Sequence, residues 1–173
     1  MAGAAVAFLF LAAIVIIIKF FQTQKLREVE KYQDPAFLKN LRKIDEFLEQ
    51  INHSNDYITW KKRDEILKKY QETSDFFRGK SKFYKKQSRV RQFNGLYENF
   101  AEFIKNYNQK YVAAQKQLNC EFFRDIEGKS LDNQQCQAII TDEYSNLIIA
   151  GAGSGKTLTI LGKVKYLIEK KNI

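Results

Sequence analysis

Apolar residues recur at helical spacing over most of this 173-residue chain. Asp34 and Pro35 form an N-cap and first-turn pair. The stretch after them places apolar side chains three and four residues apart, at Phe37, Leu41, Ile44, Leu48 and Ile51. A longer stretch, residues 90–118, keeps this alternation at Val90, Phe93, Tyr97, Phe100, Ile104, Tyr107, Tyr111, Ala114 and Leu118. Both patterns predict amphipathic helices, and the second is typical of a coiled-coil seam.

The two helical stretches predict a long antiparallel hairpin. The letters "YITWKKRDEILKKYQ" carry further apolar positions, so we expect the outgoing arm to continue to about residue 71. The chain would turn near "TSDFFRGKSK", with Gly79 at the turn, and return along residues 90–118. Trp60 and the tyrosines of the seam are then expected in the core of the hairpin. The alternative is that they form a platform on which nucleobases stack.

The chain begins with an uninterrupted apolar run. Residues 2–18 carry no polar or charged side chain, and basic residues follow from Lys19 on. At about 1.5 Å per helical residue the run spans roughly 25 Å, and Phe20 and Phe21 extend it toward the roughly 30 Å hydrocarbon core of a bilayer. We therefore predict a transmembrane anchor over residues 1–21; a signal peptide and a buried core helix are the alternatives. Because positive flanks stay inside, the prediction is a single-pass membrane protein with the residues after Lys19 in the cytoplasm.

The net charge of +9 permits binding to nucleic acid or to an anionic membrane surface. Much of this charge gathers at the predicted turn, in a segment whose basic residues are Arg78, Lys80, Lys82, Lys85, Lys86, Arg89 and Arg91. Phe83 and Tyr84 lie among them. Contact with DNA or RNA is one interpretation, because basic side chains bind phosphates and aromatic rings stack on bases. A solvated tip, or a surface that faces anionic lipid, is the other.

Residues 131–173 change the pattern. They predict a short helix over residues 133–141, an apolar strand over residues 146–149, a glycine-rich loop, and an amphipathic helix over about residues 155–170. Strand, loop and helix in this order are the context that a phosphate-binding loop requires. The loop "AGAGSGKT" keeps the eight-residue Walker A pattern, with alanine in place of its first glycine.

This loop predicts a nucleotide site. Its glycines leave the backbone free to turn N–H groups toward a phosphate at the positive end of the following helix. Lys156 would reach the β- and γ-phosphates, and the Thr157 hydroxyl would ligate Mg²⁺. We predict Lys156 and Thr157 as catalytic residues. The predicted nucleotide-binding residues of the loop are Ala150, Gly151, Ala152, Gly153, Ser154, Gly155, Lys156, Thr157 and Leu158.

Two motifs of this segment resemble those of superfamily 1 helicases of the UvrD/Rep type. "LDNQQCQAII" lies shortly before "AGAGSGKT", as the adenine-reading Q motif lies before the Walker A motif in that family. The lead-in "NCEFFRDIEGKSLDNQQ" is similar to that of the helicase IV branch, from which the apolar N-terminus departs. The resemblance implies that Gln135 binds adenine, that ATP and Mg²⁺ are the cofactors, and that the fold is RecA-like.

The predicted fold class is mainly α, in three parts. A transmembrane helix over residues 1–21 precedes a helical hairpin over residues 22–130. Residues 131–173 would then be the start, truncated after helix, strand, P-loop and helix, of an α/β RecA-like P-loop NTPase domain. One strand cannot make a doubly wound domain, and a loop with only its lysine and threonine is a poor catalyst of phosphoryl transfer. We therefore expect an N-terminal fragment that is not active alone.

Two functions follow as hypotheses. The family resemblance implies an ATP-hydrolysing 3′–5′ DNA helicase, with single-stranded DNA as the partner of its full-length motor and the membrane as the partner of residues 2–21. The alternative is a membrane-anchored helical adaptor whose hairpin binds a protein partner and whose nucleotide motif is vestigial. The loop could also belong to another ATPase class, and a preference for ATP that depends on Gln135 would exclude that possibility.

Overall fold

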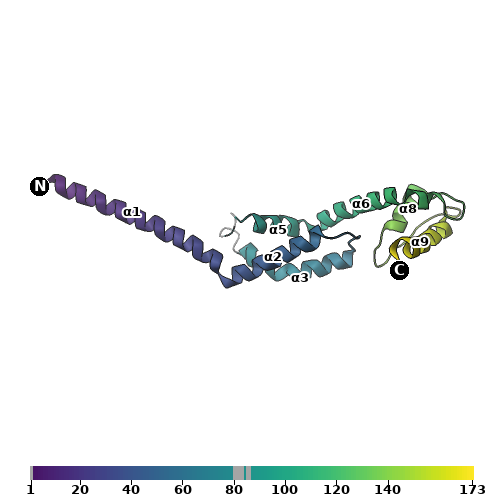
Figure 1. The fold of residues 1–173 in the computed structure, drawn as a ribbon, viewed down its shortest axis with the longest axis horizontal. Coiled ribbons are helices and arrows are strands. Elements are labelled where there is room, and N and C mark those ends of the chain that lie inside the picture. The colour runs from purple at the N-terminus through teal and green to yellow at the C-terminus, as the bar shows by residue number, and fades with distance from the viewer. Residues whose placement is uncertain (1, 80–83, 85–86) are drawn as a thin grey trace.

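The computed structural model describes the backbone of residues 2–79, 84 and 87–173, and their side chains from residue 16 on except those of residues 28 and 29. In Figure 1, α1 projects away from the other helices, α2, α3 and α5 lie in the middle, and α6, α8 and α9 form the far end. The helices of the described residues are α1 (Ala2–Gln33), α2 (Pro35–Asn52), α3 (Trp60–Gly79), α5 (Ser88–Glu98), α6 (Phe100–Leu118), α7 (Cys120–Arg124), α8 (Asn133–Ile140) and α9 (Lys156–Lys171).

α1 is one continuous helix that passes from the apolar run into a charged second half. Within the described part of the chain, no helix is long and apolar enough to cross a membrane; Met1 and the side chains of residues 2–15 lie outside the described residues. This finding contradicts the predicted anchor over residues 1–21, the membrane as its partner and the single-pass localisation. The physical reason is length, because roughly 25 Å of apolar helix falls short of a roughly 30 Å hydrocarbon core.

A first hydrophobic core joins α2, α3, α5 and the start of α6. The fully buried Phe47 of α2 lies at its centre. Its ring centroid is 5.2 Å from that of Tyr70 on α3, 5.0 Å from that of Phe93 on α5 and 5.6 Å from that of Phe100 on α6. Aromatic pairs at these distances add to the free energy of burial, so this cluster holds the middle of the molecule together.

The prediction of a long helical hairpin is wrong, because the helix of each predicted arm is interrupted. The outgoing arm is interrupted over residues 53–59, where "HSND" gathers turn-forming residues. The return arm is interrupted at Asn99, which separates α5 from α6. As a result α2 contacts both α3 and α5. Three helices can enclose a central side chain such as Phe47 that a two-helix coiled-coil seam would leave partly exposed.

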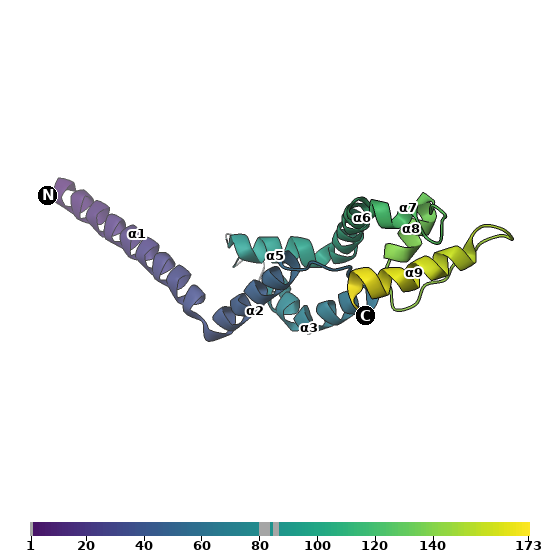
Figure 2. The ribbon, with the colours of Figure 1, turned by 45° about the vertical axis from the view of Figure 1, so that its right-hand side comes forward.

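The connection over residues 53–59 is bound to α6 and α9. The buried Asn108 side chain accepts the N–H of Ile58 at 3.0 Å and donates to the C=O of the same residue at 2.8 Å. Lys171, at the end of α9, donates to the Asp56 carboxylate at 3.1 Å. Figure 2 accordingly shows the C-terminus close to the start of α3. These bonds fix the helical middle against the C-terminal helices.

We expect Asn108→Ala to lower the free energy of unfolding by about 2 kcal/mol, because it leaves the N–H and C=O of Ile58 without their partner. Urea denaturation of the 173-residue chain, followed by circular dichroism, measures this. Asn106→Ala is the matched control, since that side chain bonds Glu102 on the exposed surface and its loss should change stability by less than about 0.5 kcal/mol. Equal effects of the two changes would contradict the role of Asn108.

A second hydrophobic core packs α9 against α8, α7 and the end of α6. Tyr166 of α9 is buried in it, with its ring stacked 5.8 Å from that of Phe123. Its hydroxyl bonds Gln115 Oε1 of α6 at 3.2 Å. Figures 1 and 2 agree in placing α9 beside α8, so the helix after the glycine-rich loop has a fixed position.

Residues 142–149 run from α8 toward the glycine-rich loop without regular structure. Leu147 and Ile149 are 85% and 88% exposed, and the residues that the structure describes contain no strand. This contradicts the predicted strand over residues 146–149, and with it an α/β start of the domain. The physical reason is that a strand needs a neighbour to bond its backbone, and no described segment offers one here.

Candidate nucleotide site

The glycine-rich loop turns sharply into α9. Gly153 and Gly155 have φ values of 73° and 80°, and Gly155 is the N-cap of the helix. A Cβ on Gly155 would also lie 2.5 Å from Nε2 of Gln135. Positive φ favours glycine at this position, and a larger residue would also displace the Gln135 amide from its contact with the loop.

Lys156 folds its side chain back into the loop. Its Nζ donates to the C=O of Ala150 at 2.8 Å and to that of Gly151 at 2.6 Å, and Ser154 Oγ also donates to Gly151 at 2.8 Å. Hydrogen bonds between a charged donor and an anionic oxygen are stronger than those to a neutral carbonyl. A phosphate oxygen in the loop would therefore compete successfully for this ammonium group.

Gln135 joins α8 to the loop. It forms a capping box with Asp132, in which Asp132 Oδ1 accepts the Gln135 N–H at 2.8 Å and Gln135 Oε1 accepts the Asp132 N–H at 2.9 Å. Gln135 Nε2 donates to the C=O of Ser154 at 3.2 Å. These bonds use one of two amide N–H donors and one of two lone pairs. One donor and one acceptor remain, as adenine recognition requires.

A cavity of about 470 Å³ lies between α8 and the loop. It brings together five of the predicted residues: Gln135, Ala150, Gly151, Ser154 and Lys156. The other predicted residues do not line it. Thr157 is exposed, and Leu158 packs against the second core. Ala152, Gly153 and Gly155 are also outside the lining. A volume of this size suits a small-molecule ligand, and its polar groups stand on both sides.

Seven lining residues were not predicted as site residues: Asp132, Gln134, Ala138, Leu147, Ile148, Ile149 and Thr159. For Asp132 a signal existed, because the spacing D-x-x-Q resembles a capping box at a helix start. Thr159 is buried, and its Oγ1 donates to the C=O of Gly155 at 3.1 Å. No local pattern distinguishes such a residue from any other in the first turns of a helix.

The packing of α9 on α8 fixes the width of the cavity. A Cβ on Gly162 would lie 2.7 Å from Cδ1 of Ile139 and 3.3 Å from Cδ1 of Leu131. One residue on, Lys163 Nζ donates to the C=O of Ile139 at 2.8 Å and of Thr141 at 3.1 Å. A cation at the C-terminal end of a helix binds free carbonyls and complements the helix dipole. Both contacts hold α9 close to α8.

We expect Gly162→Ala to destabilise the chain by about 1–3 kcal/mol, because the added methyl group overpacks the contact with Ile139. Gly95→Ala is the matched control: Gly95 lies in α5, and a Cβ added there would have no neighbour within 4 Å. Alanine at position 95 should therefore stabilise the helix by about 0.5–1 kcal/mol. Thermal unfolding of both variants tests the contact. A Gly162 variant as stable as the Gly95 variant would contradict it.

Cys136 and the aromatic seam belong to the packing. Burial raises the pKa of the Cys136 thiol, which disfavours the reactive thiolate. Of the seam tyrosines, Tyr111 is buried in the second core as predicted, whereas Tyr97 and Tyr107 are partly buried and pack against the first core. Trp60 differs from this prediction, since 46% of its surface is exposed.

The basic segment over residues 78–91 is described only in part, and Lys80, Lys82, Phe83, Lys85 and Lys86 lie outside the described residues. Tyr84 is buried, with its ring stacked 4.5 Å from that of Phe37. Arg89 forms an ion pair with Asp45 at 2.9 Å. The described residues therefore support the first core, and the nucleic-acid interpretation of the segment stays a prediction.

Comparison with known proteins agrees with the motifs. Residues 131–173 match the family described as the UvrD/REP helicase N-terminal domain. The chain is 36% identical over 64 residues to DNA helicase IV of Escherichia coli (strain K12), which is 37% of this chain and 9% of that protein. It is 54% identical over 43 residues to a probable DNA helicase II homolog of Mycoplasma capricolum, which is 25% of this chain and 6% of that protein.

A third relative is the ATP-dependent DNA helicase PcrA of Staphylococcus epidermidis, with 40% identity over 45 residues, 26% of this chain and 6% of that protein. The aligned segments thus span less than a tenth of each relative. No solved structure matches the chain significantly. Residues 131–173 are therefore similar to a segment of the UvrD/REP helicase N-terminal domain.

Proposed function

We propose that residues 131–173 supply the adenine- and phosphate-binding side of the ATP site of an ATP-dependent DNA helicase. The observation that carries this proposal is that Gln135 and Lys156 line one cavity, although they come from different helices. The relatives are named DNA helicases, one of them ATP-dependent. ATP hydrolysis, movement along DNA and unwinding are proposed for the full-length protein.

The residues fit a nucleotide in three respects. Gln135 keeps one amide donor and one acceptor for the adenine edge. Lys156 already points its ammonium into the loop, where it would bind the β- and γ-phosphates. The first backbone N–H groups of α9 have no partner within the helix and favour an anion at its N-terminus. Ser154 and Lys156, on either side of the N-cap Gly155, both line the cavity, so this N-terminus adjoins it.

Thr157 would hold Mg²⁺ through its hydroxyl, and the ion would supply charge neutralisation on the phosphates. Neither Lys156 nor Thr157 positions the attacking water, which requires further groups. We therefore propose that the 173-residue chain binds but does not turn over ATP. The boundary between a helical part up to residue 130 and a nucleotide-binding part from residue 131 also stays a proposal, and so does a protein partner for the helical part.

The experiment that tests the proposed function assays the purified full-length protein for ATP hydrolysis with and without single-stranded DNA. The same protein is then given duplexes with a 3′ or a 5′ single-stranded tail. We expect DNA-stimulated hydrolysis, and unwinding of the 3′-tailed duplex only. Hydrolysis that does not respond to DNA, or unwinding restricted to the 5′-tailed duplex, would contradict the helicase assignment or its polarity respectively.

A further inference from the structure

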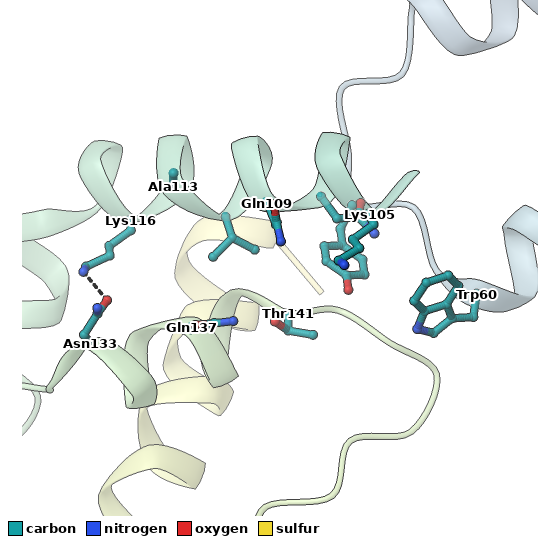
Figure 3. A pocket seen from close by; sticks show the side chains of 11 residues that line it. Trp60, Lys105, Gln109, Ala113, Lys116, Asn133, Gln137 and Thr141 are labelled. Atoms are coloured by element: carbon teal, nitrogen blue, oxygen red, sulfur yellow. Dashed lines mark hydrogen bonds between the residues drawn. The ribbon is translucent and has the colours of Figure 1, made fainter. Parts of the chain in front are cut away.

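A second cavity, of about 490 Å³, lies between α6 and α8 on the side of α8 away from the glycine-rich loop. Figure 3 shows side chains of α6 along one wall, with Lys105 and Lys116 toward its two ends, and Asn133 and Gln137 of α8 along the other wall. Trp60 stands at one end. The proposed nucleotide site uses none of these residues.

The cavity favours an anionic ligand. Its lining includes the two lysines and no carboxylate. Lys116 donates to the neutral side chain of Asn133, and neither Lys105 nor Lys116 forms an ion pair with a described carboxylate. Cations without a neighbouring counter-charge attract anions, and phosphate is the anion that lysine commonly binds.

The Trp60 ring favours a planar ligand. It is 46% exposed, and the Arg63 guanidinium lies over it, 4.5 Å from the ring centroid. A guanidinium on one face leaves the other face for stacking. The position of Trp60 is also fixed, because its backbone N–H donates to Glu143 Oε2 at 3.0 Å while the Tyr57 hydroxyl donates to Oε1 at 3.1 Å.

Amide side chains add hydrogen-bonding groups between the two lysines, as Figure 3 shows. Gln109 of α6 and Gln137 of α8 both line the cavity, and each offers donors and an acceptor. Such groups pair with the edges of nucleobases. An acidic peptide would use the lysines but would leave the exposed ring and these amides without a function.

We propose that this cavity binds a short stretch of single-stranded nucleic acid, with one base on Trp60 and successive phosphates along the wall from Lys105 to Lys116. Base stacking on an aromatic side chain combined with a cationic groove is the usual way in which single strands are bound without sequence preference. This contact is separate from the proposed ATP site and does not depend on hydrolysis.

α8 connects the two cavities. Asn133 and Gln137 lie on its face toward α6, and Gln135 and Ala138 lie on its face toward the glycine-rich loop. Nucleic acid bound at the first face would therefore bias the position of Gln135, whose amide donates a hydrogen bond to the C=O of Ser154 in the loop. Coupling between sites requires such a shared element.

The chain contains one tryptophan, so its fluorescence reports on this cavity. The experiment titrates the 173-residue chain with a short oligothymidylate, without ATP, at several salt concentrations. We expect saturable quenching of Trp60. Replacing Lys105 and Lys116 together by glutamine should weaken binding about tenfold at low salt, and should reduce the slope of log K against log salt by about 0.7 per lysine.

The matched control replaces Lys110 and Lys129 by glutamine, which removes the same charge from exposed positions outside the cavity. Equal weakening by both double variants would overturn the proposal, because it would indicate diffuse attraction. Absence of quenching would overturn it too, as would equally tight binding of polyglutamate, which indicates an acidic protein segment as the ligand. A parallel titration with oligouridylate distinguishes DNA from RNA.

A second measurement replaces Trp60 itself and follows binding by the anisotropy of a labelled oligothymidylate. Trp60→Phe should retain most of the affinity, whereas Trp60→Ala should lose about tenfold or more, because stacking contributes about 1–3 kcal/mol per base. Equal affinity of the two variants for the oligonucleotide would contradict stacking of a base on Trp60. If the Trp60 variants lose oligonucleotide binding but still bind ATP, the proposed nucleotide site is unaffected. If a Lys156→Ala protein loses ATP binding but its Trp60 fluorescence is still quenched by the oligonucleotide, the Trp60 cavity is independent of the nucleotide site.

Discussion

Lys156→Ala in the full-length protein is expected to lower ATP hydrolysis by at least about 100-fold, while affinity for single-stranded DNA changes little. The ammonium group is the only cation that the structure places in the glycine-rich loop among the described residues. Groups that neutralise phosphoryl charge contribute about two to three orders of magnitude each to such reactions. A coupled ATPase assay measures the rate, and fluorescence anisotropy measures the affinity for DNA.

Lys165→Ala is the matched control for this change. Lys165 lies on the same helix and forms an ion pair with Glu127 at 2.5 Å, away from the nucleotide cavity. Partly exposed ion pairs contribute little to stability, so we expect an ATPase rate close to that of the unchanged protein. A Lys156→Ala protein that hydrolyses ATP at the control rate would contradict the proposed role of the glycine-rich loop in binding the phosphates.

Gln135→Ala is expected to reduce the preference for ATP over GTP by about 30-fold. Two hydrogen bonds to adenine would be lost, at about 1 kcal/mol each. The same change removes half of the capping box with Asp132, so it should also destabilise α8 by about 1 kcal/mol. Competition between ATP and GTP in the ATPase assay measures the preference.

Gln135→Glu separates these two effects. Glutamate keeps the acceptor that caps α8, as in the usual capping box, but it has no N–H donor for adenine or for Ser154. We expect stability near that of the unchanged protein and the same loss of nucleotide preference. If Gln135→Glu discriminated ATP from GTP as well as the unchanged protein does, adenine recognition by this residue would be contradicted.

Helix limits were largely predictable, because they depend on local chemistry. Asp34 caps α2 as expected, with its Oδ1 accepting the N–H of Ala36 at 2.8 Å. The predicted helices over residues 133–141 and 155–170 correspond to α8 (Asn133–Ile140) and α9 (Lys156–Lys171). Capping groups and glycines act within a few residues of the positions they affect, so single stretches of sequence reveal them.

The arrangement of the helices was not predictable in the same way. Tyr97 and Phe100 keep the apolar spacing across the break at Asn99, so the pattern continues where the helix does not. The strand over residues 146–149 fails for a related reason: apolar letters indicate a buried segment, but pairing depends on partners elsewhere in a chain. Trp60 was expected in the core because periodicity records spacing and not which helix lies opposite.

In the candidate site, too, local features were predictable from the sequence and contacts between helices were not. The glycine-rich loop was predicted from its spacing, and α9 begins where that spacing requires. The contact between Gln135 and Ser154 depends on the packing of α8 on α9 at Gly162, which no local pattern contains. Only the structure places the adenine-reading and phosphate-binding candidates in one cavity.

Isothermal titration calorimetry of the full-length protein with ATP and Mg²⁺ tests the central hypothesis most directly, that Gln135 and Lys156 act in one nucleotide site. We expect one ATP bound per chain, weaker binding of GTP, and loss of most of the affinity in both Lys156→Ala and Gln135→Ala proteins. Binding heats that are the same in all three proteins, or no binding to the unchanged protein, would contradict it.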